Sequence, residues 1–188
     1  MAASTTSTAD RLTRAAHELF SAHGHGVTVD EIVARAGVAK PTFYAHFASK
    51  EVLTKAVLEQ SVAAFFAALD AELARRDDLV ERVLAPFDVM VAGLPDPEYR
   101  GCVCLNAAAT FPMPDHMSHD VLRAHDDRLT ALFADLADQA GAAKVADLAR
   151  QLLVLFDGAK ARALVDPSAL PGQDARAAAR TLVASAIC

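Results

Sequence analysis

Side chains that can contact DNA lie close together in the segment from Lys40 to Lys50, KPTFYAHFASK. Lys40 can donate to a guanine edge or to a phosphate, and Thr42 offers both a hydroxyl for hydrogen bonding and a methyl for thymine. Pro41 and Ala45 carry no side-chain hydrogen-bonding groups, so they can only touch thymine methyls or follow the shape of the groove. If one helix presents these residues on one side, they predict contact with the major groove.

Phe43 and Phe47 indicate which side of that helix is buried. They are four residues apart and so share one face, which we expect to be core rather than a base-stacking surface. At about 100° per residue, the opposite side is the one free to enter a groove. The residues with the best access are Pro41, Thr42, Tyr44 and Ala45.

The surrounding segment, residues 27–50, has the boundaries of two short helices joined by a turn. Thr28 and Glu31 have the spacing of a capping box at the start of the first helix, and Gly37 stands where a left-handed C-terminal cap is expected. Ser49 is placed to cap a third, longer helix. The order of these signals predicts a helix-turn-helix. Ordinary helical hairpins carry the same signals, so this pattern alone leaves a purely structural role open.

The region from about Arg11 to about Leu58 resembles the N-terminal domain of the TetR family of bacterial transcriptional regulators. The resemblance rests on LTRAAHELFSAHG and on VTVDEIVARAGVAKPTFYAHFASKEVL, and it covers about a quarter of the chain. Two positions depart from the usual pattern, because Ala39 stands where the family often has Ser and Pro41 where it often has Gly. The first change removes a helix-capping side chain, and neither disturbs the buried pattern.

The resemblance implies which side chains lie near DNA phosphates. It places Thr28, Tyr44, His46 and Lys50 there, in addition to the reading residues above. A cation at a helix start is unfavourable next to the positive end of the helix dipole, so a phosphate partner would explain Lys50. The alternatives are a surface His46 stacked on Tyr44 and a solvated Lys50.

An all-α fold of about nine helices is expected, because alanine is abundant and no strand-like alternation is present. We predict an N-terminal helix-turn-helix domain at residues 1–49. A long fourth helix at about residues 50–76 then leads into a C-terminal ligand-binding and dimerisation domain at residues 50–188.

The resemblance also implies a homodimer on a palindromic operator in double-stranded DNA, usually a repressor that a small molecule releases. A mostly apolar set of candidate lining residues indicates an apolar or aromatic effector; these are Phe65, Phe87, Met90, Leu105, Phe111, Phe133 and Phe156. The predicted dimer surface is an apolar helix pair carrying Leu148, Leu152, Leu155, Ala159, Leu182 and Ala186. Any of these residues could instead be ordinary core.

Charge and composition limit which other functions we expect of the chain. The net charge is −6, but residues 1–50 hold five basic and four acidic side chains against 13 and 20 in the remainder, so the asymmetry favours DNA contact by the N-terminal part. Three cysteines and no secretory signal indicate a reducing cytoplasm, and no apolar run predicts a membrane span. No nucleophile elbow, Walker loop, HExxH or paired-cysteine motif is present, so we expect neither an enzyme nor a cofactor.

Two pairs of residues allow a different regulator of the same fold. Cys102 and Cys104 could form a redox or soft-metal sensor, although positions i and i+2 of a helix point about 200° apart. His116 and His119 could hold a metal together with the neighbouring acids Asp115 and Asp120, or could form a polar rim or cap. A helical ligand-binding protein that has lost DNA binding is the remaining alternative.

Overall fold

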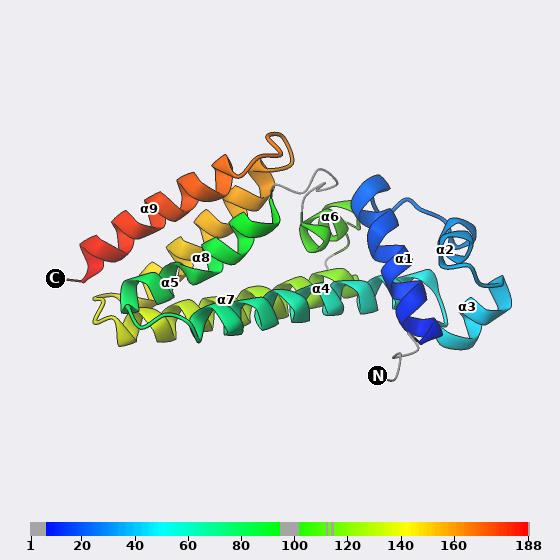
Figure 1. The fold of residues 1–188 in the computed structure, drawn as a ribbon, viewed down its shortest axis with the longest axis horizontal. Helices are drawn as coiled ribbons and strands as arrows, with labels where there is room; N and C mark the ends of the chain where they lie inside the picture. The colour runs from blue at the N-terminus through cyan, green and yellow to red at the C-terminus, as the bar shows by residue number, and fades with distance from the viewer. Residues whose placement is uncertain (1–6, 95–101, 112, 114, 188) are drawn as a thin grey trace. The chain divides into compact units, whose positions relative to one another are not determined.

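The computed structural model describes residues 7–94, 102–111, 113 and 115–187, and every regular element within them is a helix (Figure 1). In chain order these nine α-helices are α1 (Thr8–His23), α2 (Val29–Ala36), α3 (Lys40–His46), α4 (Lys50–Leu73), α5 (Leu79–Gly93), α6 (Val103–Thr110), α7 (Met117–Gln139), α8 (Val145–Arg162) and α9 (Leu170–Ala186). The predicted all-α fold is therefore confirmed. Cys188, the third cysteine, lies outside the described residues.

The chain divides into two compact units. We call residues 1–61 with 103–121 the N-terminal unit, and residues 62–102 with 122–188 the C-terminal unit. α6 therefore packs with the N-terminal unit, and α4 contributes its first half to one unit and its second half to the other. The functional boundary expected at residue 50 stays a prediction, because compactness groups residues by packing and not by role.

The N-terminal unit is built by short amphipathic helices around one apolar core. Leu12 and Phe20 of α1, Ile32 of α2 and Phe43 of α3 are almost completely buried in it. α1 begins at a capping box in which Ser7 Oγ accepts from the backbone of Asp10, a signal that the sequence analysis did not use. The core thus fixes α1, α2 and α3 against one another.

The C-terminal unit packs α5, α8 and α9 closely together. Phe87, Phe133 and Phe156 are buried at its centre, and the Phe87 ring centroid lies 5.9 Å from that of Phe133 and 5.7 Å from that of Phe156. α9 turns small residues such as Ala175 and Ala179 toward this core, which allows close approach of its neighbours. A Cβ added at Gly172, in the first turn of α9, would lie 2.6 Å from Val91 Cγ2.

Ion pairs connect α5 with its neighbours at the edge of this unit. Arg76 donates to Asp88 at 2.8 Å, and Arg176 of α9 donates to Asp88 at 2.6 Å and to Glu81 at 2.7 Å. Arg180 also donates to Glu81. Hydrogen bonds from Arg180 and Arg176 hold the pKa of Glu81 below its usual range.

α4 is the one helix among the described residues that is long and apolar enough to cross a membrane by length and composition, with a mean hydropathy of 1.5 over its most apolar window. Leu53 and Val57 are buried in the core of the N-terminal unit, and Phe66 and Leu69 in that of the C-terminal unit. A helix buried in a protein core can have the same length and apolar composition as a membrane span, so these properties alone are weak evidence for one. α4 ends at Leu73 rather than near residue 76 as predicted, because the following residues form a turn.

Candidate nucleic-acid interface

The turn between α2 and α3 has the predicted caps. Thr28 Oγ1 accepts from the backbone N–H of Glu31 at 3.3 Å, and Glu31 Oε2 accepts from the backbone N–H of Thr28 at 2.7 Å. Gly37 has φ 64° and ψ 42°, in the left-handed region that a glycine C-cap requires. The capping box and the glycine stop are confirmed.

Arg11 of α1 holds the same turn from outside the motif. Its Nη2 donates to the carbonyl oxygens of Ala36 at 2.6 Å and Gly37 at 3.1 Å. These carbonyls lie at the end of α2, where no amide of the helix is available to them. Arg11 therefore fixes the end of α2, and nothing in its local sequence indicated this role.

Phe43 and Phe47 orient α3 as expected. Phe43 is completely buried, and its ring centroid lies 6.0 Å from that of Phe47 and 5.1 Å from that of Tyr44. Tyr44 stands edge-on against Phe43 while its side chain remains 52% exposed. The phenol is thus held by packing at one end and open to solvent at the other.

The residues predicted to enter the groove share the exposed side of α3. Pro41, Tyr44 and Ala45 are exposed, and Thr42 is half-buried. His46 at the end of the helix is exposed as well. The structure therefore brings the predicted reading residues together on one surface, with only Thr42 partly withdrawn.

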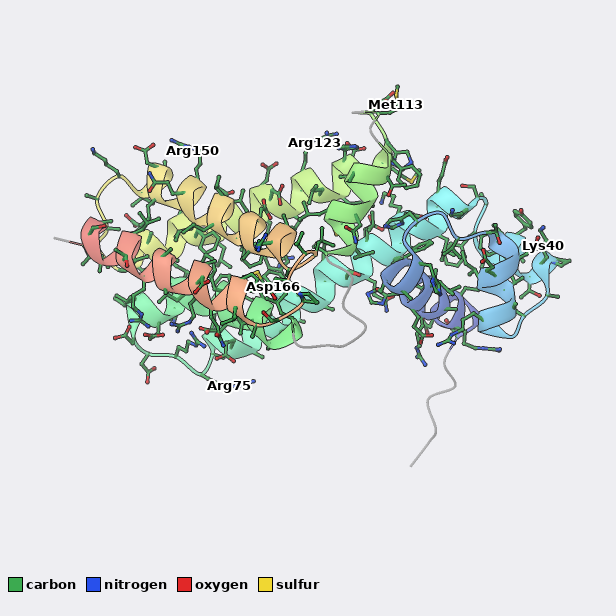
Figure 2. All side chains as sticks on the ribbon, turned by 90° about the horizontal axis from the view of Figure 1, so that it is seen from above. Lys40, Arg75, Met113, Arg123, Arg150 and Asp166 are labelled. Atoms are coloured by element: carbon green, nitrogen blue, oxygen red, sulfur yellow. The ribbon has the colours of Figure 1, made fainter. Side chains whose placement is uncertain are left out.

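Polar groups around this surface form hydrogen bonds and ion pairs within the protein. Lys40, which stands at the surface of the N-terminal unit in Figure 2, lies 2.9 Å from an Asp30 oxygen. This hydrogen-bonded pair raises the pKa of Lys40. Thr28 Oγ1 donates to Glu31 Oε2 at 2.7 Å. Each group is accessible, but each already has an internal acceptor.

Lys50, another predicted phosphate contact, also has a hydrogen-bond partner within the protein. Its ammonium donates to the backbone carbonyl of His25 at 2.6 Å, and it is half-buried. Burial lowers the pKa of Lys50. This cation at a helix start therefore has a hydrogen-bond partner within the protein, and its contact with a phosphate stays a prediction.

His25 is a buried polar residue that the sequence analysis passed over. Its Nε2 donates to the carbonyl of Val103 at 3.2 Å, and its ring packs 4.6 Å from that of Phe20. Burial lowers the pKa of His25, so the ring stays neutral near pH 7. The residue joins the α1–α2 loop to the first residue of α6 and, through its own carbonyl, to Lys50.

Comparison with known proteins decides the family. A family model described as bacterial regulatory proteins, tetR family, matches residues 12–57. The chain is 31% identical to a TetR-family transcriptional regulator from Streptomyces coelicolor, with a TM-score of 0.90 and coverage of 98% of this chain and 92% of that one. The chain belongs to the TetR family of bacterial transcriptional regulators. It is therefore a DNA-binding transcriptional regulator, from a family of regulators and not of enzymes.

Other similar proteins include a second solved structure and two regulators that differ in their action. A tetR transcriptional regulator from Streptomyces avermitilis is 33% identical, with a TM-score of 0.82 and coverage of 96% of this chain and 98% of that one. The transcriptional repressor ComR of Escherichia coli is 33% identical over 99 residues, and the activator FasR of Mycolicibacterium smegmatis is 51% identical over 49 residues. The chain spans only 47% of the length of ComR and 22% of that of FasR.

The candidate effector-lining residues divide between the two units. The phenylalanines of the C-terminal set lie together, since the Phe156 centroid is 5.6 Å from that of Phe65 and 5.7 Å from that of Phe87. Leu105 and Phe111 fall instead in the N-terminal unit, because α6 packs there. Phe133 and Met90 complete the C-terminal set and are buried. Their role in ligand binding stays a prediction.

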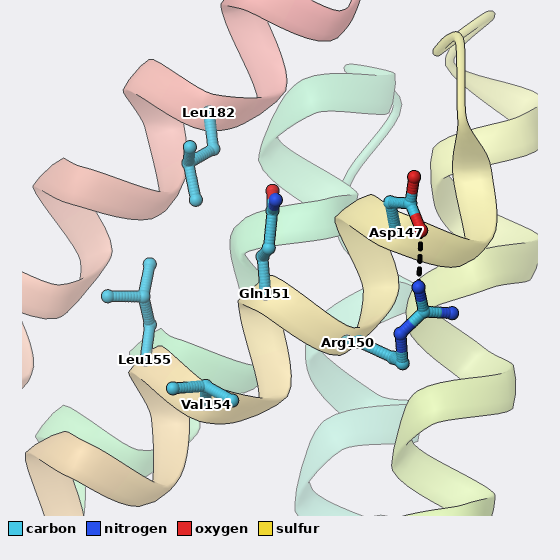
Figure 3. A pocket seen from close by; sticks show the side chains of 6 residues that line it. All are labelled: Asp147, Arg150, Gln151, Val154, Leu155 and Leu182. Atoms are coloured by element: carbon cyan, nitrogen blue, oxygen red, sulfur yellow. Dashed lines mark hydrogen bonds and ion pairs between the residues drawn. The ribbon is translucent and has the colours of Figure 1, made fainter.

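The candidate dimer residues also divide, by exposure. Leu148, Leu152 and Ala159 are buried in the core of their own bundle. Leu155 and Leu182 line an open groove of about 500 Å³ between α8 and α9, together with Asp147, Arg150, Gln151 and Val154 (Figure 3). Ala186 lines an adjoining groove of about 380 Å³. Leu155, Leu182 and Ala186 can therefore face another molecule without repacking the bundle, and Leu148, although buried, also lines the smaller groove.

The two alternative sensor pairs are not assembled into metal sites. Among the described residues, no group of three or more His, Cys, Asp or Glu side chains is placed to hold a metal ion. His116 Nδ1 accepts from the backbone of Ser118, and His119 Nε2 donates to the carbonyl of Phe111 at 2.7 Å. Cys102 precedes α6 and Cys104 is buried within it, so the helical spacing argument does not apply to both.

Proposed function

We propose that this TetR-family regulator is a cytoplasmic repressor that binds a palindromic operator as a homodimer and dissociates when a small molecule binds its C-terminal unit. The observation that carries the proposal is the exposed side of α3, held outward by the buried Phe43. An exposed helix of this kind fits the major groove, and a twofold dimer repeats it after about one helical turn of DNA, ~34–36 Å.

Each residue of the surface has an assigned role in this proposal. Pro41, Thr42 and Ala45 contact base edges and methyl groups, and Thr42 supplies the hydrogen-bonding chemistry among them. Lys40 reaches a guanine edge or a phosphate from the start of α3. Phosphates are contacted by Thr28, Tyr44, His46 and Lys50, whose donors surround the reading surface.

The α8–α9 groove supports the second part of the proposal, the homodimer. Val154 is 71% exposed, and beside it Leu155 and Leu182 form an apolar surface on two neighbouring helices. Burial of such a surface against its own copy removes apolar area from water and gives a twofold interface.

The operator test uses intergenic DNA adjacent to the gene in gel-shift titrations at several salt concentrations. We expect Tyr44→Ala and Lys50→Ala each to weaken binding to all sequences. Lys50→Ala should also flatten the salt dependence, since each phosphate neutralised by a cation contributes about one unit to the slope. Thr42→Ala should instead alter base preference by about 1–3 kcal/mol at one position.

The control is Lys55→Ala. Lys55 lies on α4 like Lys50, is partly exposed and pairs with Glu59. This variant should leave operator affinity unchanged. Because Lys50 also holds the His25 carbonyl, the helical content of Lys50→Ala must be checked by circular dichroism. Unchanged operator affinity in all three test variants would refute the assignment of this surface.

The dimer test is light scattering at micromolar concentration. Wild type should have the mass of two chains, and Leu182→Arg should have the mass of one, because it places a charge in the α8–α9 groove. The matched control is Ala131→Arg on the exposed side of α7. A monomeric wild type would refute the homodimer.

A further inference from the structure

A polar cluster lies inside the C-terminal unit, on α7 and α8, and the operator-binding role does not use it. His125 and Lys160 are each only 6% exposed. Lys160 Nζ lies 3.0 Å from Asp157 Oδ1, one turn earlier on the same helix. Asp126, next to His125 on α7, is half-buried and lies within electrostatic range of Asp157, Lys160, Cys102 and Asp127.

Three buried polar atoms of this cluster have no hydrogen bond, namely His125 Nδ1, Asp126 Oδ1 and Asp157 Oδ1. Asp157 Oδ1 still lies 3.0 Å from the Lys160 ammonium, so His125 Nδ1 and Asp126 Oδ1 are the two that lack any partner. A buried acceptor without a donor costs about 1–3 kcal/mol, and more for a charged group, so such atoms normally have a partner. A molecule that brings hydrogen-bond donors would satisfy them.

The charges of the cluster also favour a molecule that brings hydrogen-bond donors and positive charge. Two carboxylates, Asp126 and Asp157, face one buried ammonium, that of Lys160. Burial first, and then the nearby Asp157, raise the pKa of Asp126 to about 6. Burial, assisted by Lys160, lowers the pKa of His125 to about 4, so that ring is neutral and adds no positive charge at pH 7. The Arg128 guanidinium and the Asp127 carboxylate also act on these groups, so three carboxylates stand against two cations and the sum is one negative charge.

Aromatic rings surround these groups and already hold cations. His125 meets Phe65 and Phe66 edge-on, with centroids 5.6 Å apart in both cases. The Arg128 guanidinium lies 3.6 Å from the Phe66 ring centroid, and the Lys160 ammonium lies 4.8 Å from that of Phe156. Ring faces attract cations, so these surroundings accept positive charge as well as apolar groups.

We propose that this cluster is the effector subsite and that it binds a small organic cation, namely a protonated amine on an apolar or aromatic body. The ammonium donates to Asp126 Oδ1 and His125 Nδ1, and the body lies against Phe65. Phe65 and Asp126 are both half-buried, so the edge of the cluster lies at the surface, with the two acceptor atoms beneath it. The inference rests on the proposed ligand-released regulator and narrows its expected apolar or aromatic effector to a cationic one.

The test compares three molecules that share a phenylethyl body. Phenethylamine is cationic at neutral pH, 2-phenylethanol is neutral and phenylacetate is anionic. We expect binding to the full-length protein by isothermal titration calorimetry for phenethylamine, and at least tenfold weaker binding for the other two, since a charged hydrogen bond contributes roughly tenfold or more. Equal binding of all three, or binding of none, would overturn the proposal.

Two neighbouring aspartates give matched variants. Asp126→Asn should reduce the affinity for phenethylamine by about tenfold or more, whereas Asp127→Asn, which changes the exposed next residue, should leave it unchanged. If Asp126→Asn does not fold, the same loss is expected from wild type between pH 7.5 and pH 5. Protonation of Asp126 removes its charge in that range, while an alkyl ammonium stays charged.

Operator binding is measured separately on the same samples, with and without phenethylamine. A protein that binds its operator but no amine refutes the cation subsite and leaves the proposed regulator intact. A protein that binds the amine through Asp126 but no operator refutes the proposed function and leaves the subsite intact. Equal effects of Asp126→Asn and Asp127→Asn would show attraction to the acidic surface only, and would overturn the subsite.

Discussion

Replacement of Gly172 by alanine tests how closely α9 approaches α5. The added Cβ would lie 2.6 Å from Val91 Cγ2 and 2.9 Å from Leu94 Cδ1. Carbon atoms pack at about 3.5–4.0 Å, so the closer contact is about 1 Å too short. Leu94 can rotate its terminal methyl, but Val91 is β-branched and has little rotameric freedom within a helix.

The expected loss follows from two opposing terms. Overpacking of a tight interface costs about 1–3 kcal/mol. Replacement of a helical glycine by alanine normally returns about 0.5–1 kcal/mol through the unfolded state. The net expectation for Gly172→Ala is a decrease of about 0.5–2 kcal/mol in the free energy of unfolding.

Equilibrium urea unfolding, followed by circular dichroism, measures this difference. The control is Gly93→Ala at the last residue of α5, because a Cβ there meets no atom within 4 Å. The same chemical change should be neutral or stabilising by up to about 1 kcal/mol at that position. If Gly172→Ala were as stable as wild type, or if both variants changed stability equally, the close α5–α9 approach would be contradicted.

Three further predictions concern titrating groups and the turn. Burial lowers the pKa of His125 to about 4, so the stability that the neutral ring contributes is complete above the ordinary pKa of 6.5 and is lost as pH falls toward 4. Between pH 7.5 and pH 5, wild type should lose about 1–2 kcal/mol of unfolding free energy relative to His125→Gln. An equal loss of stability in both proteins would contradict this. The hydrogen bond from Arg180 lowers the pKa of Glu81. In urea unfolding, wild type should therefore be more stable than Glu81→Gln at pH 7, and this difference should shrink as pH falls below 4.5. A difference that stays constant with pH would argue against the ion pair. Gly37→Ala at φ 64° should cost about 1–2 kcal/mol in urea unfolding and weaken operator binding, with Gly37→Asn milder; equal effects of both would show that the left-handed backbone is not the cause.

Local signals in the sequence predicted local structure well. The Thr28–Glu31 box, the left-handed Gly37 and the buried Phe43 were all predictable, because each depends on residues within one or two helical turns. The sequence also predicted that Pro41 and Tyr44 would be exposed, since helical geometry follows directly from the position of the buried face.

Contacts over longer sequence distances were not predictable. Arg11 reaches the end of α2 across 25 residues, and Lys50 reaches the carbonyl of His25 across the same separation. A charged side chain carries no sign of its partner in a single sequence. The TetR resemblance implied a phosphate contact for Lys50, and nothing in the sequence indicated that this side chain also binds an internal carbonyl.

Apolar patterns also could not separate core from surface. Leu152 and Leu155 belong to the same stripe of α8, yet one is buried in its own bundle and the other lines an open groove. Likewise, Leu105 and Phe111 read as part of a C-terminal pocket, but α6 packs with the N-terminal unit. Hydrophobicity predicts burial and does not say against which partner.

The internal partners of the DNA-facing groups have a consequence for release. Lys40 pairs with Asp30, the Thr28 hydroxyl donates to Glu31, and Lys50 donates to the backbone carbonyl of His25. If these groups contact phosphates, operator binding is an exchange of one acceptor for another, and two carboxylates are left beside a negatively charged backbone. In that case the internal acceptors compete with DNA, so the net free energy of each phosphate contact is small and a modest change elsewhere in the protein can end binding.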